Sequence, residues 1–83
     1  MTREDILEAA RDFAIIREED LSGLDLSGAD LSGARFFSCS LRGADLTGAE
    51  LGKVHFKDCD LAGVNLSDTR LEKVNFANMR FPG

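Results

Sequence analysis

Residues 20–34 read DLSGLDLSGADLSGA, and this five-residue unit decides the fold. Leu or Phe recurs at every fifth position from Leu21 to Phe81 without a gap. An α-helix repeats about every 3.6 residues and a strand about every two, so a period of five fits neither element. We therefore expect a chain that turns once per unit and points each Leu or Phe toward a common axis. The predicted core comprises the following inward residues: Leu21, Leu26, Leu31, Phe36, Leu41, Leu46, Leu51, Phe56, Leu61, Leu66 and Leu71.

A second set of small or apolar residues stands two positions before the first, as Ala29 and Ala34 do. A polar residue such as Asp30 lies between the two inward positions. This alternation of inward, outward and inward side chains is that of a minimal strand. Gly often follows two residues after the inward Leu, where it supplies the positive φ required at the third residue of a type II turn. Each unit is therefore predicted to be a short strand followed by a corner.

Two of these units, ADLSG at residues 29–33 and ADLTG at residues 44–48, resemble the A-(D/N)-L-x-x consensus of the pentapeptide-repeat family. The resemblance covers about residues 19–83 and rests on thirteen successive units. It implies an all-β solenoid, namely a right-handed quadrilateral parallel β-helix with four units per coil and one unit per face. Thirteen units would then make about three coils.

The spacing of like residues agrees with four units per coil. Four units make twenty residues, so residues twenty apart should stack, and Phe36, Phe56 and Phe76 have this spacing. Cys39 and Cys59 share an inward column in the same way. We expect both thiols to be buried and reduced, packing as small hydrophobic groups. A disulfide is the alternative, because stacked backbones lie close enough for one.

Residues 1–19 break the period and are predicted to form a capping helix with a lead-in segment, which leaves 20–83 as the β-helix. Thr2 is a helix N-cap candidate, and Asp5 stands three residues later, as in a variant of the capping box. Ile6, Ala10 and Phe13 fall on one face of this helix. Because solenoids need a polar-faced cap, we expect the helix to cover the first coil. A partner-binding helix is the alternative.

The sequence contains no recognisable catalytic constellation, cofactor motif or metal-ligand spacing. The outward Asp residues occupy positions that the family fills with Asp or Asn, and we interpret them as solvated groups that hydrogen-bond to neighbouring coils. His55 is the lone histidine and is interpreted as solvated. Cys39, Cys59 and His55 do not have structural-zinc spacing. The chain is therefore predicted not to be an enzyme, with no cofactor and no small-molecule substrate.

Charge and hydropathy limit the compartments and partners that we expect. The net charge is −5 in total, with −3 over residues 1–19, −3 over 20–50 and +1 over 51–83. This acidic balance disfavours direct binding to nucleic acid. The chain has no apolar run long enough for a membrane span and no signal-peptide layout at its N-terminus. A cytoplasmic location without membrane attachment is therefore expected.

Two groups of residues are candidates for interaction with proteins. The twenty-residue stacking places Arg35, Phe37, His55 and Lys57 on the Phe-centred face, with Phe37 pointing outward. An exposed aromatic residue beside cations is a candidate contact, although single exposed apolar residues are common. The second group is an apolar C-terminal end, which is predicted to stack on a second copy as a homodimer; it comprises Phe76, Met79 and Phe81.

The predicted function is therefore that of a non-enzymatic protein–protein interaction or scaffold module. The alternative is a DNA-mimicking modulator of bacterial DNA gyrase, because some members of the family protect gyrase from quinolones with acidic columns. The column predicted here is short, and its second half is weakly basic.

Overall fold

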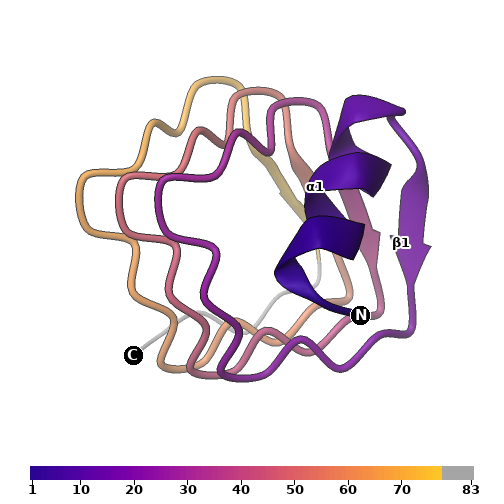
Figure 1. The fold of residues 1–83 in the computed structure, drawn as a ribbon. Coiled ribbons are helices and arrows are strands. Elements are labelled where there is room, and N and C mark those ends of the chain that lie inside the picture. The colour runs from indigo at the N-terminus through magenta and orange to yellow at the C-terminus, as the bar shows by residue number, and fades with distance from the viewer. Residues whose placement is uncertain (78–83) are drawn as a thin grey trace.

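The structure, a computed structural model, describes residues 1–77 as a square column of stacked coils with a helix across one end (Figure 1). It contains one helix and four three-residue strands, in the order α1 (Arg3–Arg11), β1 (Ile15–Arg17), β2 (Arg35–Phe37), β3 (His55–Lys57) and β4 (Asn75–Ala77). The strands form one parallel sheet in sequence order. Each strand pairs with the strand twenty residues later in the chain, so that the central residues Ile16, Phe36, Phe56 and Phe76 are in register. The predicted parallel β-helix with four units per coil is confirmed.

Helix α1 begins at a complete capping box, as the sequence predicts. The Thr2 hydroxyl accepts from the Asp5 amide at 3.3 Å, and the Asp5 carboxylate accepts from the Thr2 amide at 2.9 Å. Ile6 and Ala10 on the inner side of the helix are buried. The helix therefore covers the first coil with its apolar face.

Arg3 fixes the helix to this coil by a second contact. Its guanidinium donates to the backbone carbonyl of Asp25 and to that of Ser27, each at 3.0 Å. These bonds supply donors to carbonyls at the start of the column, where no earlier strand is available to pair with them.

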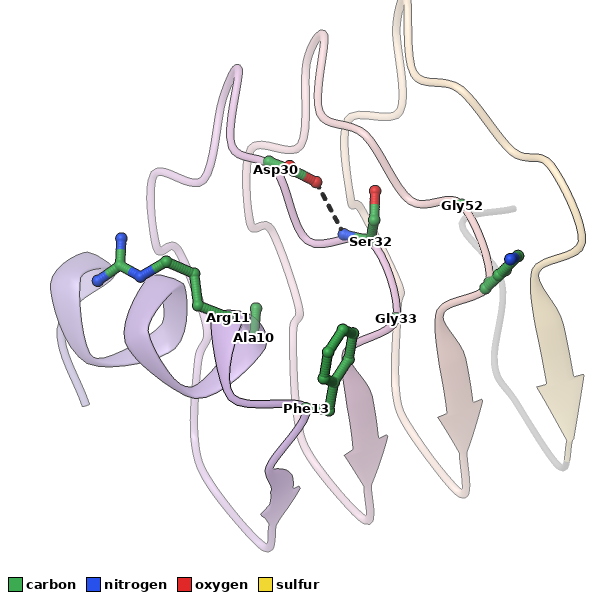
Figure 2. Close-up of a pocket in the computed structure, with 8 residues that line it drawn as sticks. Ala10, Arg11, Phe13, Asp30, Ser32, Gly33 and Gly52 are labelled. Carbon is green, nitrogen blue, oxygen red and sulfur yellow. Dashed lines mark hydrogen bonds between the residues drawn. The ribbon is translucent and has the colours of Figure 1, made fainter.

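The C-terminal end of α1 differs from the sequence prediction at Phe13. The Phe13 amide donates to the Ala10 carbonyl at 3.1 Å, and the Ala14 amide donates to the Ala9 carbonyl at 3.0 Å. These two bonds are those of a Schellman motif, in which the residue with left-handed conformation is usually Gly. Here that residue is Phe13, with φ 54°, and it is 61% exposed beside the column (Figure 2). The prediction that Phe13 lies on the buried helix face is wrong, because the helix has already ended.

The lead-in segment after the helix is itself part of the β-helix. Strand β1 pairs with β2 over all three of its residues. Its central residue, Ile16, is buried at 2% exposure. The first coil thus begins before Asp20.

The corners of the coils have positive φ every five residues, from Phe13 to Lys73. At Gly23, φ is 70°, and the surrounding turn closes through a 3.2 Å bond from the Leu24 amide to the Leu21 carbonyl. The predicted turn geometry is therefore confirmed. Seven corners hold a residue other than Gly, for which left-handed conformation costs roughly 1–2 kcal/mol, and these are Phe13, Glu18, Ser38, Lys53, Asp58, Asp68 and Lys73.

Only the Phe-centred face carries continuous strands. On each of the other three faces, adjacent coils pair through single-residue bridges, such as that of Asp25 with Asp45. The sequence predicted a short strand on every face. The difference arises at corners such as Leu21–Leu24, because the turn bond takes an amide that would otherwise extend the ladder between coils.

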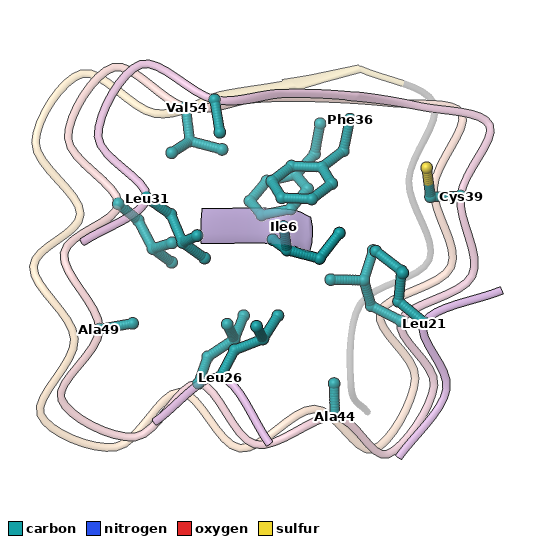
Figure 3. Packing of buried hydrophobic residues seen from close by; sticks show 14 of the residues in the cluster. Ile6, Leu21, Leu26, Leu31, Phe36, Cys39, Ala44, Ala49 and Val54 are labelled. Atoms are coloured by element: carbon teal, nitrogen blue, oxygen red, sulfur yellow. The ribbon is translucent and has the colours of Figure 1, made fainter. Parts of the chain in front are cut away.

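Inward side chains fill the interior of the column (Figure 3). The predicted core residues from Leu21 to Leu61 are at most 1% exposed, and Ile6 of the helix reaches the centre of the first coil. The rings of Phe36 and Phe56 stack with centroids 5.2 Å apart, and those of Phe56 and Phe76 with centroids 5.7 Å apart.

The predicted core weakens toward the end of the described residues. Leu66 is half-buried, and Leu71 is 48% exposed. Leu71 therefore departs from the prediction, because within residues 1–77 the coil of Leu51 covers it from one side and no further coil covers it from the other. Met79 and Phe81 lie outside the described residues. No helix in the described part of the chain is long and apolar enough to cross a membrane.

Candidate interaction surface

The outer side of the four-stranded sheet gathers cations. We call this surface the sheet face; it consists of the outward residues of β1–β4. Arg17, Arg35, His55 and Lys57 are exposed there. The four strands, all of which lie within the described residues, carry no Asp or Glu. The coil therefore brings together basic side chains that lie up to forty residues apart in sequence.

Most of the outward carboxylates of the coils lie on the other three faces. The outward residues of these faces stack by bridges between coils. The three rows are Asp20–Ser40–Asp60, Asp25–Asp45–Asn65 and Asp30–Glu50–Arg70. The column thus has one basic face and three predominantly acidic faces.

Phe37 and Arg17 form a contact on the sheet face. Phe37 is half-buried on the outer side of β2, as predicted, and the Arg17 guanidinium carbon lies 5.4 Å from the centre of its ring. At this distance the guanidinium is attracted to the ring by a cation–π interaction. Arg17 was not among the residues predicted for this face, although it stands twenty residues before Phe37 and directly after Ile16, which is in phase with the inward column.

The remaining cations of the sheet face lack carboxylate partners. Arg42, on another face, pairs with Asp60 at 3.1 Å, whereas Arg35 and Lys57 form no ion pair with any described residue. The structure brings the predicted residues Phe37, His55 and Lys57 together around a shallow hollow of about 100 Å³. Phe76, also predicted as a contact, instead lies half-buried inside the column.

Comparison with known proteins identifies the architecture. The family model described as pentapeptide repeats matches residues 13–43 and 39–78, with eight copies. The chain belongs to the pentapeptide-repeat family. The predicted family and the right-handed quadrilateral β-helix are thereby confirmed.

Two solved structures illustrate this likeness. The pentapeptide-repeat protein Rfr23 from the cyanobacterium Cyanothece 51142 is 36% identical with a TM-score of 0.78, over 82% of this chain and 47% of Rfr23. Full-length QnrB1, a plasmid-mediated fluoroquinolone resistance protein, is 24% identical with a TM-score of 0.76, over 98% of this chain and 38% of QnrB1. The chain thus spans less than half the length of either protein. No curated protein matches it.

Five outward Asp residues of this pentapeptide-repeat chain have a structural role in their own turns. Each accepts a hydrogen bond at 2.9–3.1 Å from the amide two residues later, as Asp30 does from Ser32, and the five are Asp20, Asp25, Asp30, Asp45 and Asp60. The expectation of bonds to neighbouring coils is therefore corrected for most of these carboxylates, because the amide of the same turn is nearer. Asp60 also accepts a hydrogen bond from the Arg42 guanidinium, which belongs to the adjacent, earlier coil.

These turn bonds change the acidity of the carboxyl groups. Hydrogen bonds from the serine hydroxyl and then from the serine amide lower the pKa of Asp20, Asp25 and Asp30 below the ordinary value of 3.8. The ionised form of each group is therefore stabilised in the folded state.

The two cysteines are free and buried, as predicted. The Cys39 thiol donates to the Ile16 carbonyl at 3.3 Å, and the Cys59 thiol donates to the Phe36 carbonyl at 3.2 Å. The interaction with the Cys59 thiol lowers the pKa of Cys39 to about 7, while the same interaction and burial raise the pKa of Cys59. Each residue is only 2% exposed, so access limits reaction with reagents in solvent. Within residues 1–77 no three His, Cys, Asp or Glu side chains are placed to hold a metal ion.

Proposed function

We propose that this pentapeptide-repeat chain is a non-enzymatic protein-interaction module that binds an acidic segment of a protein partner through its sheet face. The segregation of charge between the faces of the column carries this proposal. An acidic partner is attracted to Arg35 and Lys57 and repelled by the carboxylates of the other three faces. Electrostatic complementarity of this kind fixes the orientation in which two proteins meet.

The rigidity of the sheet face supports the proposal. Arg35, His55 and Asn75 stand on adjacent coils in one row, and Arg17, Phe37 and Lys57 stand in the other. Adjacent coils are about 4.8 Å apart, so the cations present a fixed and closely spaced array. Phe37 supplies an aromatic contact, and the Arg17 guanidinium lies over its ring.

Nuclear magnetic resonance of the ¹⁵N-labelled chain tests where an acidic segment binds. We expect an acetylated hepta-glutamate peptide to shift the amide resonances of β1, β2 and β3. A hepta-lysine peptide is the matched control, and it should shift the resonances of the acidic rows instead. The proposal would be refuted if hepta-glutamate shifted amide resonances evenly on all four faces, or if it shifted none.

The acidic rows favour one second candidate, modulation of bacterial DNA gyrase by mimicry of DNA. Their carboxylates stack with an axial spacing of about 4.8 Å, and three adjoining faces carry them. The likeness to QnrB1, at 24% identity, concerns the fold alone. Gyrase supercoiling of relaxed plasmid, with and without a fluoroquinolone, tests this candidate. Unchanged supercoiling in both conditions would rule it out.

A further inference from the structure

A groove runs along one corner of the column, away from the centre of the sheet face. It begins at a hollow of about 360 Å³ beside Phe13, Gly33 and Gly52 (Figure 2). It continues into a hollow of about 420 Å³ that shares Gly52 and Lys53 with the first and reaches Lys73. Gly33, Lys53 and Lys73 occupy the same corner on three successive coils.

Glycine shapes the floor of the groove. A Cβ atom built on Gly33 would lie 2.8 Å from the Phe13 ring, so only Gly allows the ring to lie in this position. One coil further along, Gly52 lines the groove and places no side chain on its floor. The ring itself is exposed, and its residue holds the left-handed conformation that helix ends usually assign to Gly. The chain thus presents an aromatic ring at one end of a groove lined by exposed backbone.

Two lysine side chains line the other end of the groove. Lys53 and Lys73 stand one coil apart, and neither forms an ion pair with any described residue. Two carboxylates also border the groove: Asp30, which accepts from the Ser32 amide at 3.1 Å, and Glu72, which precedes Lys73. The Arg11 guanidinium points away from Phe13 (Figure 2). The groove therefore has an apolar end and an end with two unpaired cations on one corner.

We propose that this groove binds an extended segment of a protein that carries a large apolar side chain and, two residues later, an acidic one. The apolar side chain packs on Phe13 and the glycine floor, and the carboxylate lies between Lys53 and Lys73. Alternate residues of a strand point to the same side about 6.6 Å apart. Counted from Gly33, against which the ring lies, Lys53 and Lys73 stand about 5 and 10 Å along the axis at one coil per 4.8 Å, which brackets this spacing. The site is separate from the sheet face and does not depend on it.

Peptide titration of the ¹⁵N-labelled chain tests this site. The probe is acetyl-Phe-Ser-Glu-amide, and the controls are acetyl-Ala-Ser-Glu-amide and acetyl-Phe-Ser-Lys-amide. We expect saturable shifts at Phe13, Gly33, Gly52 and Lys53 with the probe and binding about tenfold weaker with either control. No saturable shift, shifts confined to other faces, or equal binding of all three peptides would overturn the proposal.

Two variants separate this site from the sheet face. Phe13→Gly removes the ring while keeping a residue suited to left-handed conformation, so the fold should be retained. We expect it to weaken binding of the probe about tenfold. Lys57→Glu on the sheet face should leave probe binding unchanged. The groove proposal would be contradicted if Phe13→Gly bound the probe as tightly as the wild type, or if Lys57→Glu weakened binding of the probe. Neither result would bear on the sheet face, because the hepta-glutamate experiment tests that surface separately.

Discussion

Each position of the five-residue unit has one structural role. From Leu21 to Leu61 the inward Leu or Phe is buried, and an outward Asp accepts from the amide of its own turn. The residue two positions after the inward one takes positive φ. Because these roles recur in the coils of this part of the column, a substitution there tests the role of its position.

Leu46 tests the inward position, because it is 0% exposed in the middle of the column. We expect Leu46→Ala to lower the free energy of unfolding by roughly 2–5 kcal/mol, the range for truncation of a core leucine. Urea denaturation measures this change. Asp45→Asn is the matched control, since Asn keeps an acceptor for the Thr47 amide and the side chain points outward. Equal stability of Leu46→Ala and the wild type would show that the inward column is misassigned.

The outward Asp residues predict how stability depends on pH. Because their pKa values are lowered from 3.8, the unfolded state binds more protons than the folded state in acid. Their contribution is therefore complete above pH 3.8 and is lost as the pH falls through the lowered values. Combined replacement by Asn should reduce the loss of stability between about pH 7 and about pH 2.5. An unchanged loss in the variant Asp20→Asn/Asp25→Asn/Asp30→Asn would contradict this origin.

At the scale of the elements, the corners of the coils decide where strands can form. Three corners in each of the two coils between Leu21 and Asp60 are closed by a turn bond, such as that from the Ala44 amide to the Leu41 carbonyl at 2.9 Å. Strands of three residues remain only on the Phe-centred face. That face consequently has the most continuous backbone pairing between coils.

Gly43 tests the corners, because its φ is 69° and nothing lies within 4 Å of a Cβ atom built there. Gly43→Ala should therefore lower the free energy of unfolding through backbone strain alone, by about 1 kcal/mol after the smaller entropy of the unfolded chain is included. Gly33→Ala should cost more, because its Cβ atom would contact the Phe13 ring. Thermal unfolding compares the two variants. A Gly43→Ala variant as stable as the wild type would show that the corner is not strained.

The repetitive part of these elements, which is the stack of coils, was predictable from the sequence. The irregular part, where the helix joins the first coil, was not. The period of five predicted the inward column, and the twenty-residue spacing placed Arg35, His55 and Lys57 on one face. Arg17 was missed because the period was counted from Leu21, although the first coil already contains Ile16. The position of Phe13 could not be predicted, because residues with positive φ at a helix end are usually Gly. Only the docking of the helix on the first coil makes positive φ favourable overall for this bulky residue.

At the scale of the whole molecule, the two ends of the column differ. Helix α1 covers the first coil, whereas at the other end Leu71 is 48% exposed and Val74 is half-buried. Strand β4 is the last strand in the order of the sheet within the described residues. Edge strands and exposed apolar groups favour association with another chain.

We propose self-association through this end, as a two-fold dimer. Light scattering at high micromolar concentration should give twice the 9.0 kDa mass of one chain. Leu71→Asp should restore the single-chain mass without unfolding the column, because the side chain is already partly exposed. A wild-type mass of 9.0 kDa at high concentration would contradict the dimer.

Fluorescence anisotropy of a labelled hepta-glutamate peptide tests the sheet face most directly as the contact surface. We predict that the wild type binds the peptide, that salt weakens the binding, and that Arg35→Glu/Lys57→Glu binds at least about tenfold more weakly. Arg42→Glu/Arg70→Glu carries the same change of net charge away from this face and away from the groove, and it should bind like the wild type. Equal weakening by the two double variants would contradict the account, because net charge and not the sheet face would then determine binding.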